Sequence, residues 1–201
     1  MIRVKNQFLF SPDSITACMP ISILAIYHLY NERERVLDDD DWTLIMRNGT
    51  RLWKVWRESN TKDAYPAADE VLSLHTCSRF VNLFGNNPLE YCEWAGNTKT
   101  GVVLAESLLK MFEHVESLVK EEKKIVACLI VLPSAICLSV SCFRPNEYQY
   151  FDSHGNGRDS YCDFTIFTHP HGVIKKIYDR YNLRQLEKDS FCSYSAMLFV
   201  K

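Results

Sequence analysis

The chain has 201 residues, of which 47% are hydrophobic and 24% charged, a composition typical of one globular domain with a sizeable core. Its formal net charge of −2 gives no strong electrostatic signature of a nucleic-acid-binding protein. No apolar run is long enough to cross a membrane, because Arg33, Glu34 and Arg35 follow the first one. We therefore expect a single domain over residues 1–201, with neither a nucleic acid nor a membrane as partner.

The N-terminal half has the pattern of helices. The first helix is expected from about Met19 to about Glu34, and the aspartates 38–41 are expected to cap a second one. The sequence RNGT at 47–50 suggests that this second stretch breaks into two helices. Its apolar positions recur at helical spacing: Trp42, Ile45, Met46, Leu52, Trp53 and Trp56.

Two helices and two loops are expected in the rest of this half of the chain. A helix is expected to start near Pro66, and loops are expected at 84–88 and 95–101. The clearest helix follows, with an apolar stripe that runs from Leu104 to Leu118.

The C-terminal half has the pattern of strands. Runs rich in Val, Ile and Leu at 124–132 and 135–143 are followed by alternating stretches at 147–154 and 161–169. A short helix at 171–181 and a last strand at 193–201 end the chain. Helices first and mostly antiparallel strands afterwards predict an α+β fold, in which a helical part of about 14–121 packs on a sheet of about 124–201.

Eight cysteines are present, with no C-x-x-C pair, and no apolar N-terminal segment resembles a secretory signal. We therefore expect reduced thiols in the cytoplasm or nucleus, in a host cell if the protein is viral or bacterial. Cys18 differs from the rest because it stands two residues before Pro20. Proline is tolerated only in the first turn of a helix, so Cys18 is expected at the helix start or one residue before it. The helix dipole and free N–H groups there favour the nucleophilic thiolate; the alternative is a structural cysteine.

A nucleophilic cysteine needs a base and a group that orients the base. His154 follows Asp152 in YQYFDSHGN, at the end of an expected strand, where residues i and i+2 share a face. Asp152 is expected to accept from one ring nitrogen of His154 and leave the other for the thiolate. The alternative is a turn in which Asp152 bonds to local backbone. The other histidines fit helix faces, helix ends or a loop: His28, His75, His114, His169 and His171.

Acyl transfer also needs hydrogen-bond donors for the oxyanion. The backbone N–H of Cys18 is one candidate, and a side-chain amide is the usual second. Gln7 and Asn6 both lie in the segment that leads to Cys18. The residues alone leave three interpretations open, since either amide can serve and both can be ordinary polar residues near a terminus.

Taken in order, Gln7, Cys18 at the start of an apolar helix, and FDSHG at 151–155 resemble the herpesvirus tegument-type deubiquitinases and their tegument-like relatives. The resemblance implies a papain-like cysteine protease fold, with Cys18 as nucleophile, His154 as base, Asp152 as orienter and Gln7 as oxyanion donor. It also implies hydrolysis after the C-terminal glycine of ubiquitin through an acyl-enzyme. Ubiquitin or polyubiquitin is then the partner of an expected monomer that needs no cofactor or metal.

The ubiquitin tail carries arginines, so the resemblance also predicts carboxylates beside the site, drawn from Glu90, Glu93, Glu147 and the aspartates 38–41. Two other functions stay open. A papain-like enzyme can act on another ubiquitin-like protein or acyl substrate. A non-catalytic module can bind ubiquitin without activity, or can hold zinc through Cys162, His169 and His171 with Cys142 or Cys192.

Overall fold

The computed structural model describes residues 3–33, 35–58, 90–97, 104–132, 135–155, 161–183 and 193–201. The chain forms two compact units. One comprises Met1–Pro88 and Phe151–Phe164, and the other comprises Leu89–Tyr150 and Thr165–Lys201. In the described ranges no helix combines the length and the apolar character needed to cross a membrane. The expectation of one catalytic domain over 1–201 stays a prediction.

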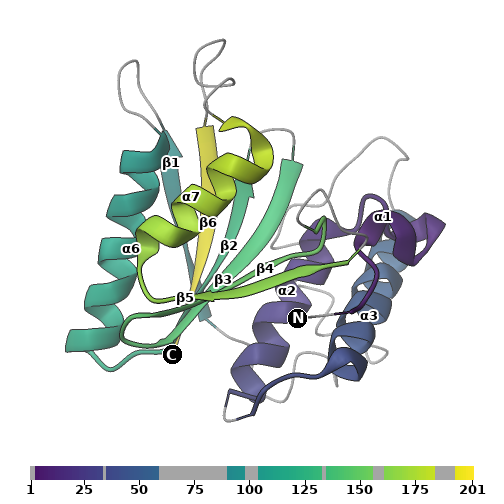
Figure 1. Ribbon diagram of the computed structural model, residues 1–201, viewed down its shortest axis with the longest axis horizontal. Coiled ribbons are helices and arrows are strands. Elements are labelled where there is room, and N and C mark those ends of the chain that lie inside the picture. Colours follow the sequence, from purple (N-terminus) through teal and green to yellow (C-terminus); the bar gives the residue numbers. More distant parts are fainter. Residues whose placement is uncertain are drawn as a thin grey trace. The chain divides into compact units, whose positions relative to one another are not determined.

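The first unit contains the helices α1 (Gln7–Phe10), α2 (Cys18–Asn31) and α3 (Asp39–Glu58), with the 3-10 helix η1 (Pro12–Ser14) between α1 and α2 (Figure 1). α2 is buried along most of its length, as its unbroken apolar sequence requires. α3 buries the face predicted from its spacing, which includes Trp42, Ile45, Met46, Leu52, Trp53 and Trp56. The first predicted helix is thereby confirmed, with its start at Cys18.

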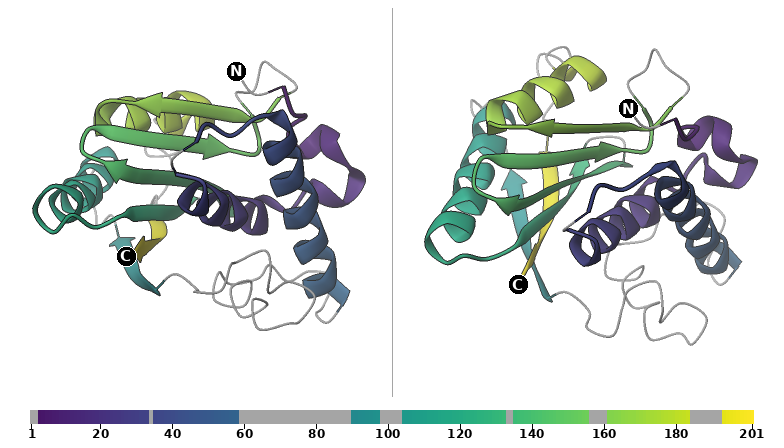
Figure 2. Two further views of the ribbon diagram at one scale, coloured as in Figure 1. Left: turned by 90° about the horizontal axis from the view of Figure 1, so that it is seen from below. Right: turned by 60° about the horizontal axis from the view of Figure 1, so that its bottom comes forward.

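The start of α3 is capped as predicted, because Oδ1 of Asp38 accepts from the backbone N–H of Asp40 (2.9 Å) and of Asp41 (3.0 Å). The predicted break at 47–50 is wrong, since α3 continues to Glu58. Gly49 serves helix packing instead of a turn. A Cβ at Gly49 would lie 2.5 Å from Cγ1 and 2.7 Å from Cα of Ile21. The absent side chain lets α2 and α3 lie side by side in close contact (Figure 2).

The second unit is built on a six-stranded sheet in the order β1-β6-β2-β3-β4-β5. β6 pairs antiparallel with β1 and with β2, and β2 pairs antiparallel with β3. The strands are β1 (Glu90–Asn97), β2 (Val126–Leu132), β3 (Ile136–Arg144), β4 (Glu147–Asp152), β5 (Asp163–Phe167) and β6 (Ser193–Val200). β4 therefore starts in the second unit and ends, at Asp152, in the first.

The strands expected in the C-terminal half are confirmed, but β1 corrects the sequence prediction. Residues 95–97 belong to this strand and not to a loop. The segment EYCEWAGN contains no β-branched residue, and its Glu, Ala, Gly and Asn residues disfavour strands, so the strand signal from Tyr91 and Trp94 is weak. Pairing with β6 along its whole length, from Glu90 opposite Val200 to Asn97 opposite Ser193, makes it a strand. The helix expected near Pro66 and the loop at 84–88 lie outside the described residues.

In its described residues the second unit also contains the helices α6 (Leu104–Glu121) and α7 (Pro170–Tyr181), which contact each other (Figure 1). The apolar stripe of α6 enters a core shared with the sheet and α7, although Leu118 is only partly buried. α7 starts at Pro170, and the side chain of His169 caps it by accepting from the backbone N–H of His171. Helices and a largely antiparallel sheet confirm the predicted α+β class.

Candidate active site

Cys18 is the first residue of α2, as its position before Pro20 predicts. The N-cap residue, Ala17, makes no side-chain bond to the helix, and the first turn of α2 contains no acidic residue. The positive end of the dipole therefore acts on the thiol without a competing carboxylate in that turn. The side chain is largely buried, with 8% of the residue exposed. This position favours the thiolate form of Cys18.

Asp152, the last residue of β4, binds His154 in two ways. Its Oδ1 accepts from the backbone N–H of His154 at 2.9 Å and contacts ring Nδ1 at 2.7 Å. Since a carboxylate can only accept, Nδ1 carries the proton, and Nε2 is left for another partner. The sequence left two alternatives for Asp152, a bond to the histidine ring and a bond to local backbone. The same carboxylate oxygen makes both.

The chain reaches His154 through a turn, and not along the strand as the sequence argument assumed, because β4 ends at Asp152. Gly155 completes this turn with a φ of +75°, and its N–H donates to the carbonyl of Asp152 at 3.2 Å. A Cβ there would lie 2.3 Å from the carbonyl oxygen of Tyr161, so the position requires glycine. Before the turn, Phe151 stacks on Trp42 of α3 with ring centroids 4.7 Å apart, which fixes the end of β4 in the first unit.

His154 is hydrogen-bonded to Cys18 as well as to Asp152. Burial disfavours the imidazolium and is the largest single influence on the pKa of His154. The hydrogen bonds and charges of Asp152 and Cys18 together outweigh it and raise that pKa to about 9. His154 is therefore protonated at neutral pH, beside a thiol that the helix start favours as thiolate. The structure brings Cys18, His154 and Asp152 into one hydrogen-bonded series within the first unit.

Gln7, the first residue of α1, is 1% exposed and is held by both of its amide atoms. Its Nε2 donates to the carbonyl of Ile15 at 2.8 Å, and its Oε1 accepts from the hydroxyl of Ser153 at 2.6 Å. Ile15 lies three residues before Cys18, and Ser153 lies directly before His154. The Gln7 side chain is thus bonded both to the segment that leads into Cys18 and to the turn that carries the histidine.

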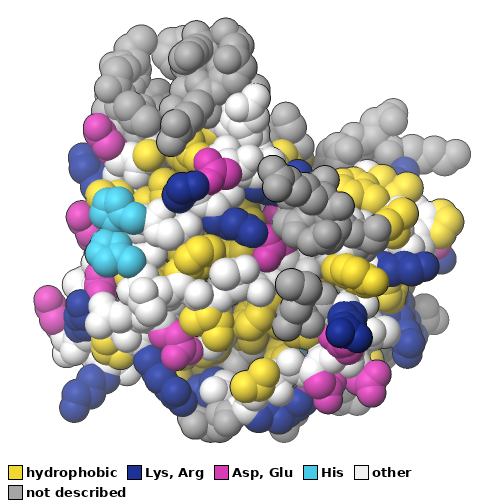
Figure 3. Space-filling model, viewed as in Figure 1, with side chains coloured by type: hydrophobic (Ala, Val, Ile, Leu, Met, Phe, Trp, Pro, Cys, Tyr) yellow, Lys and Arg dark blue, Asp and Glu magenta, His cyan; other side chains and the backbone are white. Residues whose placement is uncertain are grey.

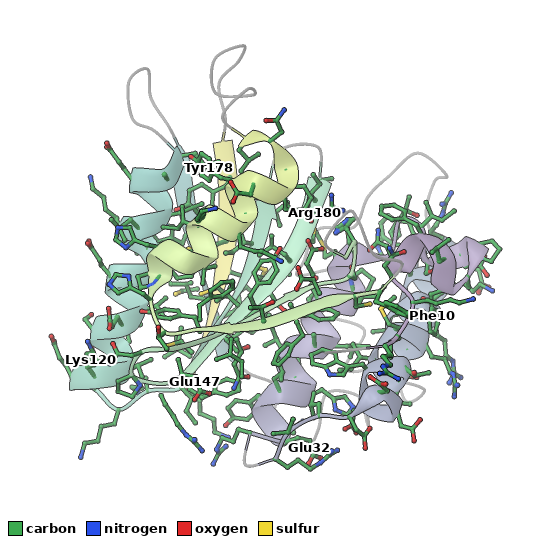
Figure 4. The ribbon with its side chains drawn as sticks, in the orientation of Figure 1. Phe10, Glu32, Lys120, Glu147, Tyr178 and Arg180 are labelled. Carbon is green, nitrogen blue, oxygen red and sulfur yellow. The ribbon has the colours of Figure 1, made fainter. Side chains whose placement is uncertain are left out.

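Asn6, the other amide that the sequence left open, has a different position. Its side-chain oxygen accepts from the backbone N–H of Phe8 at 3.2 Å and caps α1. Its backbone carbonyl accepts from Leu9 and Phe10, the last residue of α1 (Figure 4). These bonds give Asn6 a structural role at the start of α1.

One solved structure resembles this chain over its full length. The chain superposes on the ubiquitin-specific protease encoded by the murine cytomegalovirus tegument protein M48, in complex with a ubiquitin-based suicide substrate, with a TM-score of 0.68. The match covers 100% of this chain and 85% of that one, at 13% sequence identity. The chain has a papain-like cysteine protease fold.

The full-length match to the M48 protease confirms the predicted papain-like fold. The Pseudomonas avirulence protein AvrPphB is a second similar structure, with a TM-score of 0.47 and 12% identity over 90% of each chain. By sequence, no protein-family model and no curated protein matches the chain. The papain-like fold is therefore visible in the structure and not in overall sequence similarity.

The other described histidines of this papain-like chain have surroundings unlike those of His154. His28 is part of α2, where burial, the largest influence, lowers its pKa, and its buried Nδ1 has no hydrogen-bond partner among the described residues. His114 stacks on Trp94, with ring centroids 5.3 Å apart. His169 caps α7, and His75 lies outside the described residues.

Three buried thiols contrast with Cys18. Burial raises the pKa of Cys162 and of Cys142 to about 12, and that of Cys128 higher still. The Cys162 sulfur lies 3.4 Å from the carbonyl oxygen of Lys5 and 3.6 Å from the sulfur of Met46, inside the first unit. These thiols are protonated at neutral pH and act as small apolar residues, as expected of most cysteines in the chain.

The carboxylates considered for substrate recognition are in part engaged elsewhere. The Arg35 guanidinium lowers the pKa of Asp41 to about 2, and Asp38 caps α3. Glu147 lies at the start of β4 (Figure 4), and its carboxylate accepts from the amide of Gln149 at 2.8 Å. Glu93 is exposed on β1. The side chain of Glu90 lies outside the described residues, as does Cys192, one residue of the alternative zinc set. Within the described part of the chain, no group of three His, Cys, Asp or Glu side chains is arranged to hold a metal.

Two residues beside the site, Phe8 and Ser153, were not identified from the sequence. Phe8 packs its ring 5.6 Å from that of His154, although 48% of Phe8 stays exposed. Leu9 and Ile15 are exposed nearby in sequence, and hydrophobic side chains gather on the surface around α1 (Figure 3). Ser153, fully buried, bonds Gln7. Its position inside the Asp-x-His motif was the available signal, since the middle residue was taken as a spacer.

Proposed function

We propose that this chain is a cysteine-dependent deubiquitinase that hydrolyses the bond after the C-terminal glycine of ubiquitin. The observation that carries the chemistry is the hydrogen-bonded series Asp152–His154–Cys18 at the first turn of α2. A thiol activated by a helix start and an oriented histidine is suited to nucleophilic attack on a carbonyl. Ubiquitin as substrate and partner is supported by the full-length similarity to M48, which was crystallised with a ubiquitin-based substrate.

In the acylation step, the thiolate of Cys18 attacks the carbonyl carbon of the terminal glycine. The resulting oxyanion accepts from the backbone N–H of Cys18 and from Nε2 of Gln7. The imidazolium of His154 then gives its Nε2 proton to the leaving amine, the C–N bond breaks, and a thioester with Cys18 remains.

In the deacylation step, His154 is neutral and takes a proton from water while that water attacks the thioester. The second oxyanion uses the same donors. Its collapse breaks the C–S bond, restores the thiolate of Cys18 beside the imidazolium of His154, and releases ubiquitin as a carboxylic acid that loses its proton to solvent. Asp152 stays ionised throughout. Its carboxylate orients the ring of His154 and stabilises the positive charge of the imidazolium.

Turnover of ubiquitin with a fluorogenic amide at its C-terminus tests this proposal. Wild-type protein is expected to release the fluorophore, and Cys18→Ala is expected to release none. Cys92→Ala is the matched control, because Cys92 is exposed on β1. The same assay with other ubiquitin-like proteins identifies the preferred substrate. If another ubiquitin-like protein releases the fluorophore and ubiquitin does not, that protein replaces ubiquitin as the proposed substrate. Equal activity of Cys18→Ala and wild type would contradict the mechanism.

A further inference from the structure

The side-chain amide of Gln7 is locked in one of its two orientations. A glutamine amide has a donor end and an acceptor end, which a rotation of 180° exchanges. The group that faces the carbonyl of Ile15 at 2.8 Å must be Nε2, because a carbonyl can only accept. Oε1 therefore faces Ser153 at 2.6 Å, and the hydroxyl of Ser153 must donate to it. The chemistry of the two partners fixes the orientation without reference to hydrogen positions.

This orientation matters because Nε2 has two hydrogens. One is used on Ile15, and the other is the donor that the proposed oxyanion site requires. In the reversed orientation an amide oxygen would face the developing negative charge and the Ile15 carbonyl. A correctly oriented amide is thus a condition for transition-state stabilisation, and not only for packing.

Ser153 holds Gln7 more extensively than one bond suggests. Its carbonyl also accepts from the backbone N–H of Gln7 at 2.8 Å, so the serine fixes both the main chain and the side chain of the donor. Ser153 has no measurable exposure and Gln7 is 1% exposed, so water does not replace a missing hydroxyl readily. The Asp152-Ser153-His154 tripeptide therefore positions two groups, since its first residue orients the histidine and its second orients the glutamine.

We infer that Ser153 is a positioning residue of this active site, which holds the Gln7 amide with Nε2 directed to the oxyanion. The inference rests on the proposed function for its catalytic consequence, but the orientation itself can be measured without a substrate. Ser14 supplies a matched comparison. It is equally buried, and its hydroxyl donates to the backbone carbonyl of Gln7 at 2.5 Å, so it contacts the same residue without contacting the amide.

The first experiment follows the side-chain N–H signals of Gln7 by NMR, assigned by their loss in Gln7→Ala. In Ser153→Ala we expect these signals to move toward the positions of an exposed glutamine and to exchange faster with solvent. In Ser14→Ala we expect them to change little. Unmoved signals in Ser153→Ala would overturn the inference. The measurement stays decisive if the wild-type protein proves inactive on ubiquitin, in which case only the proposed function fails.

The second experiment measures kcat and KM. Loss of one oxyanion donor lowers kcat about 10²–10³-fold, and a misoriented donor is expected to cost about 10-fold or more, with KM nearly unchanged. Ser153→Ala should show this loss of kcat. Ser153→Thr keeps a hydroxyl and should recover part of the lost kcat. Ser14→Ala should keep the wild-type kcat. In a Gln7→Ala background, Ser153→Ala should lower kcat no further, because the two act as one unit. If the fold-losses in kcat of the two single variants multiply in the double variant, Ser153 has a structural role and the inference is contradicted.

Discussion

One oxygen atom of Asp152 makes both bonds to His154: Oδ1 accepts from the backbone N–H at 2.9 Å and binds ring Nδ1 at 2.7 Å. The first bond closes the turn after β4, and the second sets the tautomer and direction of the ring. The turn after β4 and the orientation of the His154 ring therefore depend on the same carboxylate oxygen. A change at Asp152 is expected to alter the chemistry of His154 directly.

Asp152→Asn should lower kcat while leaving measurable turnover, whereas His154→Ala should abolish turnover, because in the proposed mechanism His154 transfers the proton and Asp152 orients its ring. The variant should also change the pH profile. The pKa of His154 is about 9, so activity should fall as pH rises through 9 and the imidazolium is lost. Without the carboxylate, burial still lowers this pKa, so the alkaline limb should move to lower pH. If the alkaline limb lay at the same pH in wild type and in Asp152→Asn, the limb would not report the titration of His154.

The stability of the protein should depend on pH through the same residue. The pKa of His154 is raised from an ordinary value of 6.5 to about 9 on folding. Its contribution to stability is therefore fully present below pH 6.5 and is lost as pH rises through 9. Thermal denaturation should show that the difference in Tm between wild type and His154→Ala narrows over this window. A difference that grows with pH would have the wrong sign for an imidazolium held by Asp152 and Cys18.

Gln7→Ala should lower kcat about 10²-fold or more with KM nearly unchanged, as expected of a donor used mainly in the transition state. The sequence places Gln7 in the segment that leads to the first predicted helix, but the residue begins α1 and is buried. The variant is therefore also expected to lose about 1–3 kcal/mol of stability, through the buried partners left unpaired. Asn6→Ala should reduce stability by loss of the α1 cap and keep the wild-type kcat. A larger kcat loss at Asn6 than at Gln7 would exchange their roles.

Gly49→Ala tests the packing of α3 against α2, the helix that begins at Cys18. Alanine at a helix interior is ordinarily more stable than glycine by about 1 kcal/mol. Here the added Cβ would lie 2.5 Å from Cγ1 of Ile21, so destabilisation of about 1–3 kcal/mol is expected. Arg47→Ala, at an exposed position of the same helix, should change stability by less than about 0.5 kcal/mol. Chemical denaturation measures both, and a stabilised Gly49→Ala would show that α2 and α3 are not in close contact.

The sequence predicted those parts of the fold and site that depend on local chemistry. Pro20 placed Cys18 at the start of α2, and the apolar periods of α3 and α6 located their buried faces. Contacts distant in sequence carried the rest. β1 is a strand because β6 pairs with it, and Gly49 continues a helix because Ile21 lies against it. The motif spacing suggested that Asp152 orients His154, but not that Ser153 bonds Gln7 across 146 positions.

The most direct test of the central claim is reaction with ubiquitin that carries an electrophile at its C-terminus, followed by mass-spectrometric mapping of the adduct. Cys18 should be modified at neutral pH, because it is hydrogen-bonded to His154 at a helix start, whereas burial keeps Cys128, Cys142 and Cys162 protonated. Reaction should fail in His154→Ala and persist in Cys92→Ala. An adduct on Cys18 that disappears with His154 is the result that we predict. An adduct on another cysteine, or none in a folded protein, would contradict the proposed nucleophile and its substrate.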